Sequence, residues 1–392
     1  MKNFFYANIK RDLDRLRIEG NLRSLPNVHH EGKWIICNGK RMVNLSSNDY
    51  LGIASQPDLV SPFCGGLKGE SLLLGSGSSR LLTGNYTIYE RVERYLAERY
   101  CARAALFFSS GYHLNSGLLP AITSVAKCLI LADRLVHASI IDGIRLSRAD
   151  FIRYRHLDLD HLLSLLKKRS SDYEIVIVVT ESIFSMDGDV APLSTLVELK
   201  REFKKILLYV DEAHAVGVRG NSGLGIAEEQ GCIEGIDFLC GTMGKAYASE
   251  GAFVICTKES REFFINHART FIFTTALPPL QMEWSLYTMH LAERMGEERR
   301  RIREISSFIR ERIAGADTPS QSHIIPLMAG ESSKALEQAR LFREAGFYLL
   351  PVRPPTVPEG SSRIRVSISA AMSNEDAENF IEVCKKVRAN GT

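Results

Sequence analysis

The chain has 392 residues, of which 45% are hydrophobic and 24% are charged. These proportions are typical of a globular protein, and the length suits one large α/β domain with a smaller one, or two or three domains. The net charge of +3, from 49 basic and 46 acidic residues, is too near balance to indicate a nucleic-acid or membrane partner.

The cysteines and the N-terminal residues are informative about the cellular location of the protein. Eight cysteines are scattered without a C-x-x-C pair: Cys37, Cys64, Cys101, Cys128, Cys232, Cys240, Cys256 and Cys384. This usage is typical of reduced thiols in a cytoplasmic protein, and we expect no metal site. Residues 1–16 lack the pattern of a cleaved leader, and no apolar run approaches the ~18 residues that would span a membrane.

The first 45 residues predict an N-terminal arm. Residues 1–25 have the apolar spacing of an amphipathic helix that Pro26 would end. Residues 33–45 predict a small hairpin that turns at Asn38-Gly39. We expect this arm to precede a large α/β domain over 46–283 and a small α+β domain over 284–392.

Two segments of the expected large domain are candidates for binding a phosphate. The glycine- and serine-rich stretch 75–84 is a weak signal, because it lacks a dinucleotide or P-loop fingerprint and a flexible loop explains it equally well. The stretch 109–113 is the better candidate. It lies between a predicted strand at 104–108 and a helix at 115–121, where small residues leave backbone N–H groups free for an anion.

Three short apolar runs predict strands that are buried on both faces. They lie at 175–179, 206–210 and 238–240, and none alternates with polar residues. Polar clusters follow each run, at 180–182, 211–214 and 241–245. Because the carboxyl ends of parallel strands meet at one edge of a sheet, we expect an acid, an imidazole, a hydroxyl and a lysine to converge there.

This combination of groups suits pyridoxal 5′-phosphate (PLP). A lysine can form a Schiff base with the aldehyde, and a buried carboxylate can hold the proton of the pyridine nitrogen. The candidates are Lys245 and Asp211. A single lysine after a strand is commonly a solvated residue and a single aspartate a helix cap, so the prediction depends on the three clusters together. His137, just past a predicted strand at 129–132, is either a capping residue or an aromatic lid over the ring.

The C-terminal part predicts the small α+β domain. After a long helical pattern over 284–313, the order is strand, helix, two strands and helix, at 323–328, 332–345, 347–352, 363–369 and 376–387. Between the last two strands, prolines stiffen the loop 353–358. Its Arg353 suits recognition of a carboxylate, although pairing with a structural acid explains it equally well.

Seven motifs carry a family resemblance that covers nearly the whole chain. They are SSNDYLG (46–52), GSGSSRLLTG (75–84), SSGY (109–112), DRLVHAS (133–139), TESIFSMDGDVAPL (180–193), DEAHAVGV (211–218) and TMGKA (242–246). In these motifs the chain resembles the α-oxoamine synthases, which are PLP-dependent enzymes of the aspartate-aminotransferase-like fold (fold type I). The resemblance implies a large, mainly parallel sheet domain, a small α+β domain, and a homodimer with its active site at the subunit interface.

The same resemblance implies an acyltransferase reaction, the decarboxylative condensation of an amino acid with an acyl thioester. The segment 353–370 is similar to the biotin-pathway branch, which joins L-alanine to a pimeloyl thioester of CoA or acyl-carrier protein. A branch that uses glycine or serine with another acyl-CoA is the alternative. A non-catalytic partner subunit is disfavoured by the presence of Lys245, and a NAD-type dehydrogenase by the missing dinucleotide fingerprint.

The resemblance also implies roles for individual residues. Lys245, His137, Asp211 and His214 would be catalytic. Contacts with the coenzyme would come from Gly111, Tyr112, His137, Ser185, Asp211, His214, Thr242, Lys245 and, from a second subunit, Thr274 or Thr275. Substrate contacts would come from Asn48 and Arg353 to the amino-acid carboxylate, and from Arg23 and Thr356 to the acyl group. Two departures from the family pattern, Glu250 and Ala215, leave room for altered substrate choice.

Overall fold

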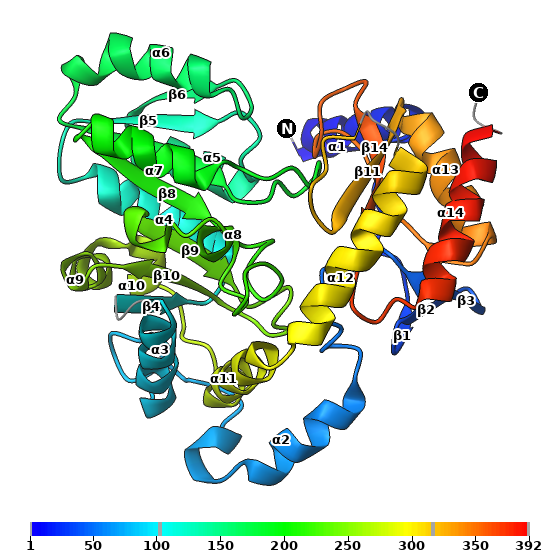
Figure 1. The fold of residues 1–392 in the computed structure, drawn as a ribbon, viewed down its shortest axis with the longest axis horizontal. Helices are drawn as coiled ribbons and strands as arrows, with labels where there is room; N and C mark the ends of the chain where they lie inside the picture. Colours follow the sequence, from blue (N-terminus) through cyan, green and yellow to red (C-terminus); the bar gives the residue numbers. More distant parts are fainter. Residues whose placement is uncertain (1, 101–103, 315–317, 390–392) are drawn as a thin grey trace. The chain divides into compact units, whose positions relative to one another are not determined.

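The computed structural model describes residues 2–100, 104–314 and 318–389, so Cys101 lies outside the described residues (Figure 1). The chain forms two compact units. The sheet unit comprises Gln56–Ser185 and Asp189–Arg300, and the terminal unit comprises Met1–Ser55, Met186–Gly188 and Arg301–Thr392. The expected boundaries after residues 45 and 283 therefore differ from the observed ones, because the N-terminal arm groups with the C-terminal part.

Strand pairing explains this grouping. β3 (Lys40–Asn44) runs parallel to β12 (Phe347–Tyr348), with Val43 opposite Phe347 in the same buried core. The expected single helix over 284–313 is also divided. α11 (Pro279–Glu293) packs against α3 (Thr87–Arg99) in the sheet unit, and α12 (Gly296–Ile309) begins at a glycine after a short break.

The sheet unit is built on seven strands in the order β4-β10-β9-β8-β7-β5-β6. β10 is antiparallel to both neighbours, and the remaining pairs are parallel. The three apolar runs form neighbouring central strands, as predicted. The bounds are β4 (Ala104–Phe108), β5 (Cys128–Asp133), β6 (Asp150–Tyr154), β7 (Ile175–Glu181), β8 (Ile206–Asp211), β9 (Phe238–Thr242) and β10 (Ala252–Cys256).

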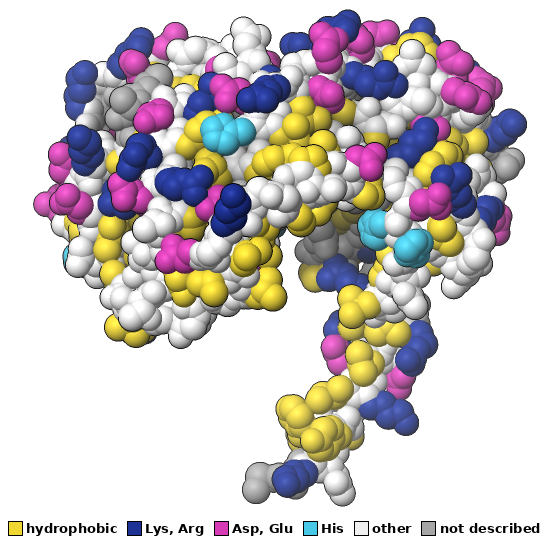
Figure 2. Space-filling view, turned by 90° about the horizontal axis from the view of Figure 1, so that it is seen from below, with side chains coloured by type: hydrophobic (Ala, Val, Ile, Leu, Met, Phe, Trp, Pro, Cys, Tyr) yellow, Lys and Arg dark blue, Asp and Glu magenta, His cyan; other side chains and the backbone are white. Residues whose placement is uncertain are grey.

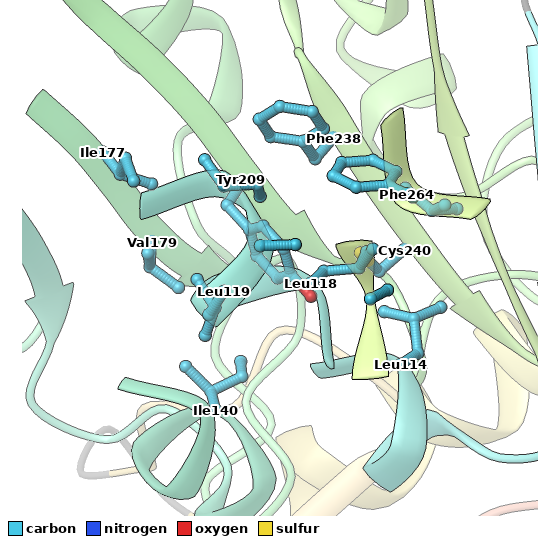
Figure 3. Close-up of a cluster of buried hydrophobic side chains, with 14 of the residues drawn as sticks. Leu114, Leu118, Leu119, Ile140, Ile177, Val179, Tyr209, Phe238, Cys240 and Phe264 are labelled. Carbon is cyan, nitrogen blue, oxygen red and sulfur yellow. The ribbon is translucent and has the colours of Figure 1, made fainter. Parts of the chain in front are cut away.

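Helices cover this sheet because its strands are apolar on both faces. Figure 3 shows one side of the core, where leucines of α4 and Ile140 of α5 lie with Val179, Tyr209 and Phe238 of the strands. The remaining helices of the unit are α2 (Val60–Gly66), α4 (Gly111–Thr123), α5 (Ala138–Ser147), α6 (Leu159–Arg169), α7 (Leu193–Glu202), α8 (Ile226–Glu229), α9 (Lys258–His267) and α10 (Arg269–Ile272).

The terminal unit holds two small sheets, β1-β2-β3-β12 and β11-β14-β13. The hairpin turns at Asn38-Gly39, where both φ angles are positive (50° and 74°), as its sequence predicts. The first helix ends at Ile18, before the expected Pro26, because Gly20 takes a left-handed conformation. The other bounds are α1 (Lys2–Ile18), β1 (His29–Glu31), β2 (Trp34–Cys37), β11 (Ile324–Gly330), α13 (Ser332–Glu344), β13 (Pro351–Val352), β14 (Ser362–Ser367) and α14 (Asn374–Ala389).

The surface and the helices were also compared with the requirements of membranes and metal ions. Over the face shown in Figure 2, basic, acidic and apolar side chains are interspersed, as a net charge near zero predicts. None of the described helices combines the length and the apolar character that crossing a bilayer requires. No group of side chains in the described part of the chain could hold a metal ion.

Candidate active site

A lysine and a histidine meet at the carboxyl edge of the central strands. Lys245 lies in the loop that follows β9, and His214 lies three residues past the end of β8. The Nζ atom of Lys245 is 2.8 Å from the Nε2 atom of His214, which is buried. The strand ends therefore place these two side chains side by side, at the edge that the sequence indicated.

Asp211, the last residue of β8, is held by hydrogen bonds on both carboxylate oxygens. Its Oδ1 accepts from the backbone N–H of Ala213 (2.9 Å), and its Oδ2 accepts from Nδ2 of Asn115 (3.0 Å). The Tyr209 hydroxyl donates to Oδ1 of Asn115 (2.5 Å) and so fixes the amide orientation. Both carboxylate bonds come from N–H donors, so both oxygens of Asp211 act as acceptors.

His137 lies at the start of α5 and is tied into the same network. Asn115 donates to the Ser139 hydroxyl (2.9 Å), and Ser139 Oγ lies 2.8 Å from Nδ1 of His137. The backbone N–H of Ser139 also donates to Nδ1, so His137 is the N-cap of α5, while its side chain remains exposed. Desolvation lowers the pKa of His137 although the Asp211 carboxylate opposes this. A neutral, exposed ring suits the face of an aromatic ligand as well as a cap.

The start of α4 offers an anion site. Ser110 caps this helix by accepting from the backbone N–H of His113 (3.2 Å), and Gly111 is the first helical residue. A Cβ atom added to Gly111 would lie 4.0 Å from the Thr242 hydroxyl, so this hydroxyl borders the helix start. The half-exposed Tyr112 donates its hydroxyl to Asp142. Free N–H groups and a hydroxyl at a helix N-terminus suit a phosphate.

For Ser185, Thr274 and Thr275, the remaining expected coenzyme contacts, the structure gives only a position in the fold. Ser185 is partly buried and lies beyond the end of β7. Thr275 pairs with Ser79 in an isolated antiparallel bridge, which brings the glycine-rich stretch 75–84 beside the segment with Thr274. A role for either threonine through a second subunit stays a prediction.

An ion-pair network ties together three loops at this edge of the sheet. His156, after β6, lies 2.8 Å from Asp133 at the end of β5 and bonds through Nε2 to Asp189 after β7. Burial opposes a charge on His156, but the hydrogen bonds with Asp133 and Asp189 outweigh it and raise the pKa of His156 to about 10. The network fixes the loops that carry His137 and Ser185.

Three residues that the sequence analysis left without a role stand out here. Asn115 lies four residues after Gly111, so both residues lie on the same face of α4, and this spacing could have identified Asn115 as a site residue. Glu181 ends β7 directly opposite Asp211 and is 3% exposed. Arg365 lies on β14, every residue of which is buried.

In the terminal unit, Arg365 lies beside Asn48. Its guanidinium donates to Oδ1 of Asn48 (3.2 Å), to the Tyr50 hydroxyl (3.1 Å) and to the Ser367 hydroxyl (2.7 Å). We expected Asn48 to act with Arg353, but Arg365 is the arginine at Asn48. The reason is that β14 turns both of its arginines, Arg363 and Arg365, into polar interior surroundings.

Arg353 forms a second cluster with Arg23 and Thr356. Arg23 donates to the Thr356 hydroxyl (2.8 Å), and Arg353 donates to the Gly20 carbonyl. Within the described chain, no carboxylate pairs with Arg23 or Arg353, and the buried Nε of Arg353 has no hydrogen-bond partner. Burial and the charge of Arg23 lower the pKa of Arg353. Both arginines line a cavity of about 680 Å³ together with Lys40, Arg340 and Arg343.

The two departures from the family pattern have ordinary surroundings. Glu250 is exposed to solvent. Ala215 follows His214 in the sequence and is fully buried, and its methyl side chain adds no polar group to the core. Neither adds a charge to the buried network around Asp211.

The groups described above fit PLP. Lys245 offers an amine for the aldehyde, Asp211 a carboxyl acceptor for the protonated ring nitrogen, and His214 an imidazole for the ring hydroxyl. The start of α4 with Thr242 offers donors for the phosphate. No group in this set conflicts with the coenzyme, although Glu181 adds a second carboxyl beside Asp211.

Comparison with known proteins identifies the family. Residues 40–383 match the model of "Aminotransferase class I and II". The chain belongs to this family. A Haemophilus influenzae protein provisionally named an 8-amino-7-oxononanoate synthase is 47% identical over 95% of this chain and 98% of its own length. A Neisseria meningitidis protein of the same name is 46% identical over 95% of this chain and 98% of its own.

Solved structures support the same assignment. Sphingomonas wittichii serine palmitoyltransferase is 27% identical with a TM-score of 0.86, and covers 96% of both chains. The 8-amino-7-oxononanoate synthase of Francisella tularensis is 26% identical with a TM-score of 0.74, over 90% of this chain and 99% of that one. Other serine palmitoyltransferase structures contain PLP. The chain thus has the fold type I architecture of a PLP-binding family and is a homologue of its α-oxoamine synthases, whose reaction is a C-acyl transfer.

Proposed function

We propose that the protein condenses L-alanine with a pimeloyl thioester of CoA or acyl-carrier protein, using PLP. The products are 8-amino-7-oxononanoate, the free thiol carrier and CO2, in biotin biosynthesis. The observation that carries the proposal is 47% identity over almost the whole chain to a protein provisionally named for this activity. The meeting of Lys245 with His214 beside Asp211 supplies the chemical groups.

The residues of the sheet unit would handle the proton and the coenzyme. PLP supplies an electron sink when its ring nitrogen is protonated. Asp211, which is fixed by two hydrogen bonds, would keep that proton on the ring nitrogen. Lys245 would hold the coenzyme through its aldehyde, and its amine, when free, would accept the proton from the Cα atom of the amino acid. His214, 2.8 Å from Lys245, holds the amine in position. His137 would contact the ring, and the start of α4 with Tyr112 and Thr242 would hold the phosphate.

The residues of the terminal unit would hold the two carboxylates of the substrates. Arg365 with Asn48 binds the carboxylate of the amino acid, because its guanidinium is already aimed by three hydrogen bonds. Arg23, Arg353 and Thr356 bind the far carboxylate of a dicarboxylic acyl chain. In their cavity these two arginines, which pair with no carboxylate, lie with apolar residues such as Leu336 and Leu350, whereas the lining Arg340 is paired with Glu344. A pair of such arginines beside apolar surface suits methylene groups ending in a negative charge. Arg353 as the amino-acid site is the competing assignment.

A synthase for glycine or serine with another acyl-CoA is the second candidate. The likeness to serine palmitoyltransferase, with a TM-score of 0.86, favours it. The identity of 27% to that enzyme is much lower than the 47% to the first relative, which favours alanine. The unpaired arginines at the acyl cavity also favour a charged chain end over a plain fatty acyl chain.

Product analysis tests the proposal. The PLP-loaded protein is incubated with alanine, glycine or serine and with pimeloyl-CoA, pimeloyl-acyl-carrier protein or palmitoyl-CoA. Mass spectrometry should find 8-amino-7-oxononanoate only with alanine and a pimeloyl donor. Formation of a product from serine and palmitoyl-CoA, with none from alanine, would contradict it. The Lys245→Ala variant is the matched control for non-enzymatic condensation.

A further inference from the structure

Two carboxyl groups end neighbouring strands below the coenzyme site of the sheet unit. Glu181 ends β7 and Asp211 ends β8, and the parallel ladder pairs these two residues directly. Partners in such a ladder project toward the same face of the sheet. Glu181 is 3% exposed and Asp211 is 8% exposed. The proposed function gives Asp211 a role at the ring nitrogen and gives Glu181 none.

The hydrogen-bond partners of the two groups differ. Both oxygens of Asp211 accept N–H bonds, from Ala213 and Asn115. The carboxyl of Glu181 accepts from the backbone N–H of His137, but its buried Oε1 atom has no partner. Among the described residues no cation lies within ion-pair distance of Glu181, and the nearby amine of Lys245 is bonded to His214. Asp211 thus has N–H donors on both oxygens, whereas Glu181 has a single backbone donor and one buried oxygen without a partner.

Electrostatics then decides which of the two carries a proton. An ionised carboxylate that is buried without a partner costs several kcal/mol, so such a group takes up a proton instead. Two adjacent carboxylates also disfavour double ionisation. Burial first, and then the charges of Asp211 and Asp133, raise the pKa of Glu181 well above its usual range; Lys245 and the His137 N–H oppose this without reversing it.

We propose that Glu181 is a neutral carboxylic acid in the working protein, a positioning residue that leaves Asp211 as the one charged member of this pair of carboxyl groups. This inference presupposes the PLP site of the proposed function. With a single anion there, the ring proton has one defined acceptor. A second anion would over-stabilise positive charge on the bound coenzyme and move the pH at which it titrates. The hydroxyl of Glu181 also supplies a donor on the side where Oε1 is unpartnered.

Infrared spectroscopy of the full chain tests the protonation state directly. Glutamate labelled with ¹³C at the carboxyl carbon shifts its C=O stretch away from that of aspartic acid. A protonated-carboxyl band should persist at pH 8.5, with and without PLP, and disappear in Glu181→Gln. Glu212 is the matched control, because burial raises the pKa of Glu212 to about 7 and this residue is ionised at pH 8.5. The band should therefore survive in Glu212→Gln, and its absence there or in the wild type overturns the proposal.

The absorbance of the bound coenzyme gives a second readout. In Glu181→Gln the midpoint of its pH titration should move by less than about 0.3 unit, because one neutral group replaces another. Loss of a neighbouring negative charge would instead lower the midpoint by about one unit, and that result overturns the proposal. Asp211→Asn should shift the midpoint strongly and weaken coenzyme binding. No effect in Asp211→Asn would refute the PLP site itself, whereas the infrared band reports on Glu181 alone. If Glu181→Gln does not fold, the wild-type and Glu212→Gln infrared spectra still show whether a buried glutamate other than Glu212 is protonated at pH 8.5.

Discussion

The coenzyme side of the sheet unit and the arginine cluster of the terminal unit are organised in opposite ways. Around Asp211, the polar groups are hydrogen-bonded within the protein through Asn115, Tyr209 and Ser139, with Oε1 of Glu181 as an exception. Around Arg353, several basic side chains and one carboxylate, Glu344, line a cavity, and a buried guanidinium nitrogen of Arg353 has no partner. The first region is preorganised before a ligand arrives, whereas the second should gain its counter-ions from the substrate.

The difference is sharpest between the two arginines of the terminal unit. Arg365 is 9% exposed and directed by three side chains of its own unit. Arg353 has one backbone acceptor and a cationic neighbour. A residue of the first kind serves structure as well as binding, and one of the second kind serves mainly binding. Five variants test this contrast, beginning with the largest expected effect.

Replacing Lys245 by alanine should remove the reactive centre of the preorganised side. Turnover should fall by at least about 10³-fold, because the proton acceptor of the Cα step is lost. The visible absorbance of the lysine-bound coenzyme should vanish, while far-ultraviolet circular dichroism stays the same. Condensation at the wild-type rate by this variant would end the assignment.

Exchanging the two arginines for lysine separates their tasks. Arg365→Lys should raise the KM for the amino acid about 10- to 100-fold, because the two-pronged hold on a carboxylate is lost. Arg353→Lys should raise the KM for the acyl thioester about tenfold and change the amino-acid KM less than about twofold. Steady-state kinetics with each substrate varied will measure both effects.

The exposed Arg11 of α1 provides the control, since Arg11→Lys should alter neither constant. If Arg353→Lys mainly raises the amino-acid KM, the assignment of the two arginines must be reversed. If neither variant affects either KM, the substrate role of the terminal unit is wrong.

Replacing His156 by glutamine should loosen the loops of the preorganised side in a pH-dependent way. A pKa raised to about 10 in the folded state means that the stability from the charged ring is complete below about pH 6.5 and is lost as the pH rises through 10. The variant should be less stable by about 2–3 kcal/mol at pH 6 and nearly equal to the wild type above pH 10. Urea unfolding of the coenzyme-free protein across this range provides the measurement.

His29, exposed on β1, supplies the comparison, because His29→Gln should leave the curve unchanged. A stability difference between His156→Gln and the wild type that is constant from pH 6 to 10 would mean that His156 is not charged in the network.

Replacing Tyr209 by phenylalanine should have the smallest effect. The variant loses the hydroxyl that orients Asn115 and keeps the packing of the ring, at a cost of about 1 kcal/mol. Coenzyme affinity should fall about fivefold because Asn115 can then rotate away from Asp211. Tyr173→Phe loses a comparable bond, to Asp150, and should not change coenzyme affinity. Equal losses of affinity in both variants would remove the special role of the Tyr209 bond.

Local sequence patterns predicted much of the fold. The runs that became β7, β8 and β9 were recognisable because continuous apolar residues leave no solvent-facing side. The break between α11 and α12 and the pairing of β3 with β12 were missed. The helical periodicity continues across the break, and a parallel pair formed by residues about 300 positions apart leaves no local signal.

The candidate site was predictable to a similar extent. Lys245, Asp211 and His214 follow strand ends, so the topology of a parallel sheet was enough to group them. Arg365 was missed because alternation along a strand indicates which residues share a face, and not whether the second face is also buried. Asn115 and Glu181 required the three-dimensional packing of α4 and β7 against β8.

The antiparallel strand β10 has a consequence for how the protein is made. Within the sheet, β4 pairs with β10, and β10 lies between it and β9. A ribosome must therefore translate past Cys256 before the Gly111 turn, which follows β4, can be anchored beside the lysine loop. Until then the nascent chain carries a hydrophobic β4 with no strand to pair with, and chaperone binding should be concentrated in this interval of synthesis.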